Sequence, residues 1–257
     1  MGQVTVTLTK TIKEFLRQKT VLFWTILWPI IWVLIGSFSF TGNAPPEVVS
    51  HIRGAISISM MVFALMTAGM ANLPGNIAQD RERGLLAKLM SMPISPWRDF
   101  VGRITALLAF SSLSAISVVL TGYICGARFS YSTLAFIEAI GFILLIFIAS
   151  AGIGLIISTF IRHVHGAIMT GVGLTVISAA ISGVMTPYTY LPLILQQFAR
   201  IYPLSSANSS ITYLLVGKDY AGYNPLSTVQ ISLTVTISLL IFIIGLVAYS
   251  KLCWKKE

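Results

Sequence analysis

The densest group of charged side chains in this sequence is the stretch QDRERGLLAKLMSMPISPWRDFVGR, from Gln79 to Arg103. It holds eight of the 25 Lys, Arg, Asp and Glu residues of the chain, yet it lies between two long apolar segments. Leu85, Leu86, Leu89 and Met90 recur at helical spacing before Pro93, so the stretch predicts a short amphipathic helix. Its polar edges, with Lys88 and Ser91, suit a protein partner. Its leucines would equally suit a layer of lipid head groups.

The sequence contains no recognisable motif for catalysis or for binding of a cofactor. The chain has no GxxxxGK[ST] phosphate loop, and its one Gly-Lys pair, Gly217-Lys218, is followed by Asp219. ATP therefore has no predicted site in this chain. His163 and His165 are two residues apart without a neighbouring carboxylate or cysteine, so a charged turn is favoured over a metal site. We expect no enzyme activity, no metal and no cofactor in this chain.

Three tryptophans, Trp24, Trp28 and Trp32, are spaced four residues apart and share one face of a helix. Pro29 lies among them, and a proline inside a helix removes one backbone hydrogen bond and can kink it. Packing within the bilayer, with Trp24 as an anchor at the interface, is the favoured interpretation. An aromatic row along a substrate path is the alternative.

Glu138 is the one acidic residue within the apolar runs. Acidic groups at membrane depth are candidates for a function in transport. If Ser132 or Thr133 caps the helix, Glu138 lies about 8–9 Å along it at 1.5 Å per residue. At that shallow depth, snorkelling to the outer interface or pairing with Arg128 or Arg200 is favoured over a role in proton or cation coupling.

The elements that must position these residues are membrane helices. The chain has 257 residues, of which 56% are hydrophobic and only 10% are charged, whereas soluble domains carry about 25% charged residues. Uninterrupted apolar runs of about 20 residues predict helices rather than barrel strands. We expect one transmembrane domain, residues 1–257, with spans at Val21–Phe40, Gly54–Leu73, Ile104–Ala127, Leu134–Phe160, Gly166–Met185 and Val229–Tyr249.

The basic residues that give the chain its net charge of +9 lie mainly on one side of the predicted membrane spans. Thirteen basic residues flank the spans on one side, at the amino end, in the Gln79–Arg103 stretch, after the fourth span and in the tail. The other side has only Arg53, Arg128, Arg200 and Lys218. The positive-inside rule therefore places both termini in the cytoplasm and explains the charge without nucleic acid. Cys125 and Cys253 fall on opposite sides, so they should not pair within one chain.

Two regions outside the spans are predicted to form helices at the interface. In residues 5–19, Leu8, Ile12, Phe15 and Leu16 form one apolar face between basic residues, which indicates an amphipathic helix on the cytoplasmic surface. Thr186–Thr228 contains two apolar clusters that are too short to span, separated by prolines. Two short helices that dip part-way into the outer leaflet fit this pattern.

Two motifs far apart in the chain carry a resemblance to a known family. The first is Glu82-Arg83-Gly84, a leucine-rich stretch, Met92-Pro93 and Gly102-Arg103, and the second is Leu191-Pro192, Gln196-Gln197, Ala199 and Tyr202-Pro203-Leu204. They resemble, in turn, the loop that precedes the third span and the pattern between spans five and six in the type-2 permease family of ATP-binding-cassette exporters. The resemblance covers essentially the full chain. It implies an all-α membrane protein with six transmembrane helices, an amphipathic leader, a cytoplasmic coupling helix between spans 2 and 3, and two half-inserted helices between spans 5 and 6.

The resemblance implies a permease subunit that pairs with a second copy or a paralogue in the plasma membrane. Separate ATPase subunits would bind ATP and Mg²⁺ and dock on the coupling helix. The short outer loops resemble the drug and small-lipophile branch, which implies ATP-driven efflux of a hydrophobic or amphiphilic substrate. Export of a polysaccharide or glycolipid is the alternative, and an ATP-independent carrier using Glu138 is a further one. The implied ATPase contacts are Arg81, Glu82, Arg83, Gly84, Leu85, Leu86, Lys88 and Leu89.

Overall fold

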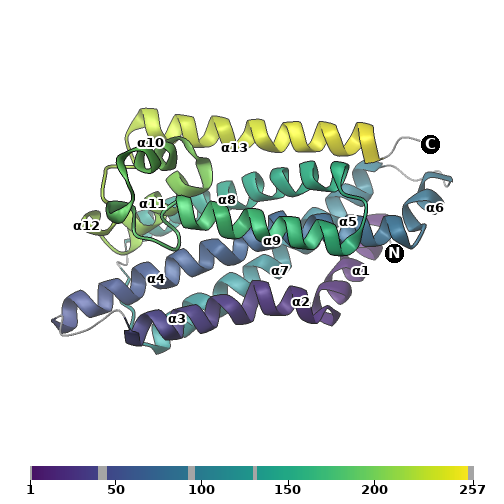
Figure 1. The fold of residues 1–257 in the computed structure, drawn as a ribbon. Coiled ribbons are helices and arrows are strands. Elements are labelled where there is room, and N and C mark those ends of the chain that lie inside the picture. Colours follow the sequence, from purple (N-terminus) through teal and green to yellow (C-terminus); the bar gives the residue numbers. More distant parts are fainter. Residues whose placement is uncertain (1, 40–44, 92–95, 130–131, 254–257) are drawn as a thin grey trace.

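The computed structural model describes residues 2–39, 45–91, 96–129 and 132–253. All regular elements of these residues are helices, and six helical segments are long and apolar enough to cross a membrane (Figure 1). The predicted fold class, an all-α protein with six transmembrane helices, is confirmed. The six segments are Lys19–Ser39, Pro46–Glu82, Trp97–Ile124, Thr133–Phe160, Val164–Ile181 and Thr228–Lys251.

The first two spans are each divided by a π-helix. The first consists of α2 (Lys19–Leu22), η1 (Phe23–Leu27) and α3 (Trp28–Ser39), and the second of α4 (Pro46–Thr67), η2 (Ala68–Asn72) and α5 (Leu73–Glu82). The remaining spans are α7 (Pro96–Ile124), α8 (Thr133–Phe160), α9 (Val164–Ile181) and α13 (Thr228–Ala248), which continues into η4 (Tyr249–Cys253).

The second span is the central helix of the bundle and is longer than predicted. Within its most apolar 18 residues 83% are buried, against at most 56% in the other five spans. The predicted end was Leu73, but the helix continues through Pro74 to Glu82. Pro74 cannot donate a backbone hydrogen bond, and the wider π turn of η2 directly before it accommodates this loss without ending the helix. As a result, Asp80 and Arg81 lie on a packed helix and not in a loop.

Glycines of α8 and α9 allow backbone contact with η2. A Cβ atom built on Gly154 would lie 2.0 Å from the carbonyl oxygen of Gly69, and one built on Gly171 would lie 2.1 Å from that of Met70. Real Cβ atoms do not approach other atoms so closely, so any larger residue at either glycine would push these helices apart. The wide turn of the central helix is therefore enclosed on two sides.

The shorter helices outside the spans are α1 (Gln3–Arg17), α6 (Leu85–Ser91), η3 (Tyr188–Tyr190), α10 (Leu193–Ile201), α11 (Pro203–Leu215) and α12 (Lys218–Ala221). Four of these six, α1, α6, α10 and α11, lie where the sequence predicted helices, whereas η3 and α12 were not predicted. Helix α11 is nearly enclosed by protein, since every residue from Pro203 to Thr212 is buried. Helix α10 is the opposite case, because only Ala199 of its nine residues is buried. The depth of these two helices in a bilayer stays a prediction.

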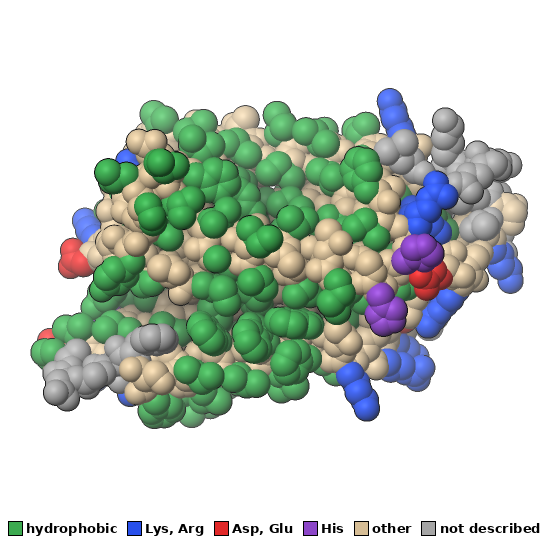
Figure 2. All heavy atoms as spheres, viewed as in Figure 1, with side chains coloured by type: hydrophobic (Ala, Val, Ile, Leu, Met, Phe, Trp, Pro, Cys, Tyr) green, Lys and Arg blue, Asp and Glu red, His purple; other side chains and the backbone are tan. Residues whose placement is uncertain are grey.

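The two ends of the bundle differ in charge. Helices α1 and α6 and the end of α13 lie together at one end, and the connection with α12 lies at the other (Figure 1). We call the first the basic end, because Lys and Arg side chains gather there while hydrophobic side chains cover the length of the bundle (Figure 2). Its exposed basic residues include Lys13, Arg17, Lys19, Lys88 and Arg98.

Candidate functional site

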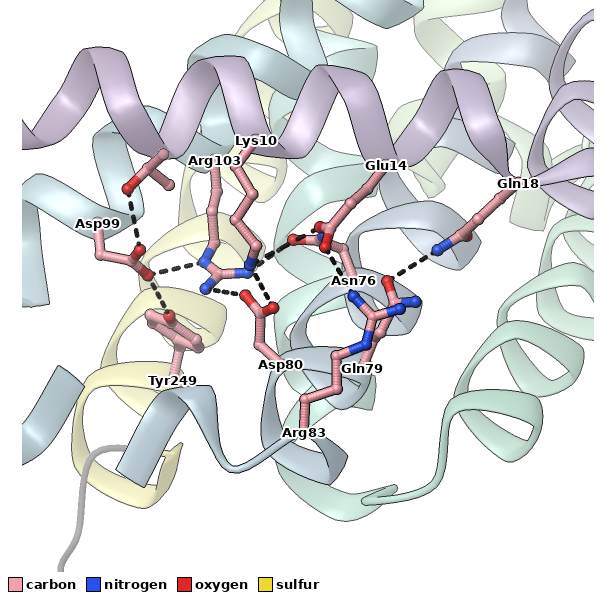
Figure 3. A network of polar contacts seen from close by, with 11 residues as sticks. Lys10, Glu14, Gln18, Asn76, Gln79, Asp80, Arg83, Asp99, Arg103 and Tyr249 are labelled. Atoms are coloured by element: carbon pink, nitrogen blue, oxygen red, sulfur yellow. Dashed lines mark hydrogen bonds and ion pairs between the residues drawn. The ribbon is translucent and has the colours of Figure 1, made fainter. Parts of the chain in front are cut away.

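A buried arginine on α7 is the centre of a polar network at the basic end (Figure 3). Arg103 is 1% exposed. Its Nε donates to Asp99 Oδ2 at 2.7 Å, one turn earlier on the same helix, and its Nη2 forms an ion pair with Asp80 Oδ2 at 2.5 Å. Its Nη1 donates to Asn76 Oδ1 at 2.6 Å. Every nitrogen group of this guanidinium thus has a partner, and the contacts join α7 to α5.

Helix α1 adds its own side chains to this network. The Lys10 ammonium contacts Asp80, and Asn76 donates through Nδ2 to Glu14 Oε2 at 2.8 Å. Glu14 also accepts from Arg83 Nη1 at 3.1 Å, so it reaches the residue next to Gly84 at the start of α6. Figure 3 shows α1 running across the network with its side chains directed toward α5 and α7. The amphipathic leader is therefore attached by ion pairs to the second span and to Arg83 at its end, and by a hydrogen bond from Thr7 to Asp99 of the third span.

The network contains equal numbers of opposite charges. Burying an ionised group costs several kcal/mol, and only closely paired and hydrogen-bonded groups recover this cost. Thr7 Oγ1 at 3.3 Å and Tyr249 OH at 3.4 Å supply further donors to Asp99. Because the positive and negative charges of the network sum to zero, these ionised groups can be accommodated among apolar spans. The three bases are Lys10, Arg83 and Arg103, and the three acids are Glu14, Asp80 and Asp99.

The glycine before Arg103 brings α1 close enough to form these contacts. A Cβ atom built on Gly102 would lie 2.8 Å from Thr7 Cβ and 2.9 Å from the carbonyl oxygen of Val4. A side chain at this position would separate α1 from α7 and lengthen the contacts of Lys10. The Gly102-Arg103 pair thus has a physical basis: the glycine permits the close approach of α1 to α7, and the arginine pairs with Asp80 and Asp99, the aspartates that side chains of α1 also contact.

Helix α6 follows directly from the helix that carries this network. Gly84 has a φ of 67°, a left-handed conformation that glycine adopts without strain, and it turns the chain from α5 into α6. Arg83, immediately before the turn, remains bound to Glu14 of α1. A displacement of α6 would consequently act on α5 and, through two ion-paired carboxylates, on α1 and α7.

The predicted contact residues of this region divide into exposed and packed ones. Glu82, Arg83, Gly84 and Lys88 are exposed, and Leu85 and Leu89 are half-buried. Leu86, also among the implied ATPase contacts, is only 2% exposed, so it packs within the chain.

Arg81 belongs to the packed group. It donates through Nη1 to the Ser158 carbonyl at 3.2 Å and through Nη2 to Cys253 Sγ at 3.0 Å. Its side chain therefore joins the ends of the second, fourth and sixth spans, and it is not a free surface charge. Burial raises the pKa of the Cys253 thiol above its ordinary value, with Arg81 opposing this effect.

A comparison with protein-family models matches residues 2–216 to the ABC-2 type transporter family. The chain belongs to this family. It is the membrane component of an ABC transporter, a multi-pass permease subunit, and such permeases typically pair with an ATP-binding subunit. A search of curated proteins found no match.

The tryptophans of this ABC-2 permease form one continuous aromatic row. Ring centroids of Trp24 and Trp28 are 5.4 Å apart, and those of Trp28 and Trp32 are stacked at 6.0 Å. All three are half-buried. Trp24 packs against the small cluster of Ala71 with residues of α9, whereas the other two pack against the main core. The row therefore lies along the first span, with Trp24 beside the fifth span and all three side chains partly accessible.

Glu138 lies on the surface of the permease and not inside its bundle. It is exposed on α8 among exposed Leu134 and Ile137, which are 66% and 61% accessible. Among the described residues, neither Arg128 nor Arg200 forms an ion pair with it, so the structure does not provide the predicted pairing. Snorkelling along the surface of the fourth span stays the prediction for this residue.

The sequence interpretation missed the network because it treated these charges as residues that flank the spans. Arg103 was counted among the basic residues that orient the chain, although it is buried and neutralised within the bundle. The available signal was spacing, since Asp99 and Arg103, and likewise Lys10 and Glu14, are four residues apart on one helix face.

Proposed function

We propose that this ABC-2 permease exports hydrophobic or amphiphilic small molecules, drug-like or lipid-like, across the plasma membrane, driven by ATP that a separate subunit hydrolyses. Its basic end faces the cytoplasm, so the termini lie inside, as the thirteen basic residues on that side suggest. A second copy or a paralogue completes the transport path.

One observation supports this proposal more than any other. The end of α5 and helix α6 together present the exposed side chains of Glu82, Arg83 and Lys88 at the basic end, directly beside the buried network, and only Lys88 of these lies on α6 itself. A docked ATPase would favour one packing of the spans over another through contacts with α6, and the network would carry the movement to α1 and α7. ATP binding and hydrolysis belong to the partner, and this chain supplies the docking surface.

The substrate path is assigned to the aromatic row of Trp24, Trp28 and Trp32. Half-buried indole rings offer a large apolar surface with few fixed polar partners, which suits cargo of varied shape. The fifth span, which Trp24 contacts, has only 33% of its most apolar residues buried, so much of its surface is available for a second permease subunit.

Export of a glycan or glycolipid is the second candidate, and a hollow at the opposite end favours it. The hollow has a volume of about 430 Å³ and is lined by Tyr213, Lys218, Asp219, Gly222, Tyr223 and Asn224. Aromatic rings together with amide and carboxylate groups are a combination that binds sugars through stacking and hydrogen bonds.

Transport into proteoliposomes distinguishes these candidates. The permease is reconstituted with its ATPase, and uptake of a lipophilic fluorescent dye and of a labelled oligosaccharide is followed with ATP and with a non-hydrolysable analogue. We expect ATP-dependent movement of the dye, slowed in Trp28→Ala but not in Tyr223→Ala. ATP-dependent movement of the oligosaccharide alone, slowed by Tyr223→Ala, would replace this proposal with the second candidate.

A further inference from the structure

Arg200, at the end of α10, is placed between two tyrosine rings. Its Nε donates to Tyr188 Oη at 2.7 Å. Its Cζ lies 5.0 Å from the centroid of the Tyr223 ring and 5.8 Å from that of Tyr188. The two rings are themselves in contact, with centroids 4.7 Å apart. These contacts fix the Nε side of the guanidinium, while no hydrogen bond from a terminal Nη group to another described residue is present.

The positive charge of Arg200 is not neutralised within the described part of the chain. Glu47, Glu138 and Asp219 are the described acidic residues of the half of the bundle away from the basic end, and none of them forms an ion pair with Arg200. This contrasts with Arg103, which is paired with two aspartates. Arg200 is exposed, so an anion can approach its free Nη side, where two parallel N–H donors match a phosphate group.

The surface beside Arg200 is strongly apolar. Leu193, Ile194 and Ile201 are 78%, 80% and 59% exposed, and they share one face of α10. Tyr190, just before the helix, is 79% exposed. Arg200 falls at the edge of this face, next to the position of Leu193, at the helical rotation of 100° per residue. A positive group at the margin of an exposed apolar face is complementary to a ligand with an anionic head and hydrocarbon chains.

The depth of Arg200 agrees with such a ligand. Its carbonyl oxygen accepts a hydrogen bond from the side chain of Gln230, which lies in the first turn of α13. Arg200 is therefore level with the end of the last span, where lipid head groups meet the hydrocarbon core. Tyrosines such as Tyr188 and Tyr223 are typical of that interface.

We propose that Arg200 and the exposed face of α10 bind an anionic phospholipid, with the phosphate on the Nη groups and the acyl chains along Leu193 and Ile194. In the orientation proposed above this lipid belongs to the outer leaflet. The site is additional to the proposed export function and does not depend on which cargo is carried. The unbalanced charge favours an anionic lipid over a neutral one, and the two tyrosines keep the guanidinium in its binding orientation.

The test is native mass spectrometry of the purified permease, titrated with phosphatidylglycerol or with phosphatidylcholine of the same acyl chains. We expect the wild type to bind phosphatidylglycerol more tightly than phosphatidylcholine. Arg200→Gln should weaken phosphatidylglycerol binding about tenfold, the scale of one hydrogen-bonded charge pair, and should leave phosphatidylcholine binding nearly unchanged. Arg128→Gln is the matched control, because Arg128 is also exposed at that end. Ile194→Asn should weaken binding of both lipids.

Several outcomes would overturn the proposal. Equal binding of the two lipids to the wild type would remove the selectivity that the charge predicts. Equal losses in Arg200→Gln and Arg128→Gln would show a general charge effect and no site. If Arg200→Gln instead changed the oligomeric state and left phosphatidylglycerol binding intact, the face would be an interface between copies. The control for folding is the unfolding temperature of both arginine variants. If it is unchanged from the wild type, any loss of lipid binding is not a loss of fold.

Discussion

Replacing Arg103 with Met should destabilise the permease far more than any exposed charge substitution. Met has a similar length but no charge, so Asp80 and Asp99 would remain buried with only Lys10 to balance them. Removing one partner of a buried ion pair costs about 3–5 kcal/mol, since the remaining charge is not compensated. In a chain of this size each kcal/mol lowers the unfolding temperature by about 2–4 °C. We expect a decrease on the order of 10 °C.

The assay is thermal unfolding in one detergent at one scan rate, because membrane proteins often unfold irreversibly. Arg98→Met is the matched control, since Arg98 lies on the same helix and is exposed. Its effect should stay within about 0.5 kcal/mol, as for most surface substitutions. Adding Asp99→Asn to Arg103→Met should recover part of the loss, because Asp80 and Lys10 then balance each other. Equal unfolding temperatures for Arg103→Met and Arg98→Met would refute the argument that the network stabilises this end.

Three further predictions test other parts of the structure. Gly102→Ala should cost about 1–3 kcal/mol through overpacking against α1, measured by the same unfolding assay, whereas Gly141→Ala, with open space around it, should be neutral or stabilising. Cys125, half-exposed at the opposite end, should react with a membrane-impermeant maleimide added to intact cells, and Cys253 should not. In detergent, Cys253 should react slowly and only at higher pH, because it is buried and its raised pKa keeps it protonated; fast labelling at neutral pH would contradict this. Glu138→Gln should leave transport unchanged at normal expression, and complete loss would favour an ion-coupled carrier.

The long apolar runs allowed the spans to be predicted, because about 20 uncharged residues have few alternatives to a membrane helix. The end of the second span was not predictable in the same way. Pro74-Gly75 looks like a helix stop, and only packing of the π turn against α8 and α9 keeps the helix continuous. The local sequence around Pro74 contains no information about the contacts that Gly154 and Gly171, distant in the chain, make with the π turn.

The candidate site was only partly predictable for a related reason. The exposed residues Glu82, Arg83 and Lys88 follow from the amphipathic pattern around Gly84. The buried position of Arg103 depends instead on α1 folding back over Gly102, a contact between residues far apart in the chain. Charge density alone indicated residues that flank the spans, whereas Asp80, Asp99 and Arg103 of this stretch are buried and paired inside the bundle.

The central claim, that the surface around α6 docks an ATPase, is tested most directly by co-purification. The tagged chain is isolated from gently solubilised membranes of its native host as wild type, as Lys88→Glu and as Lys251→Glu. Both lysines are exposed at the basic end, but only Lys88 is on α6. We predict that a P-loop ATPase co-purifies with the wild type and with Lys251→Glu and is lost from Lys88→Glu. Recovery of no ATPase with any of the three, or equal recovery with all, would contradict the assignment of α6 as the docking helix.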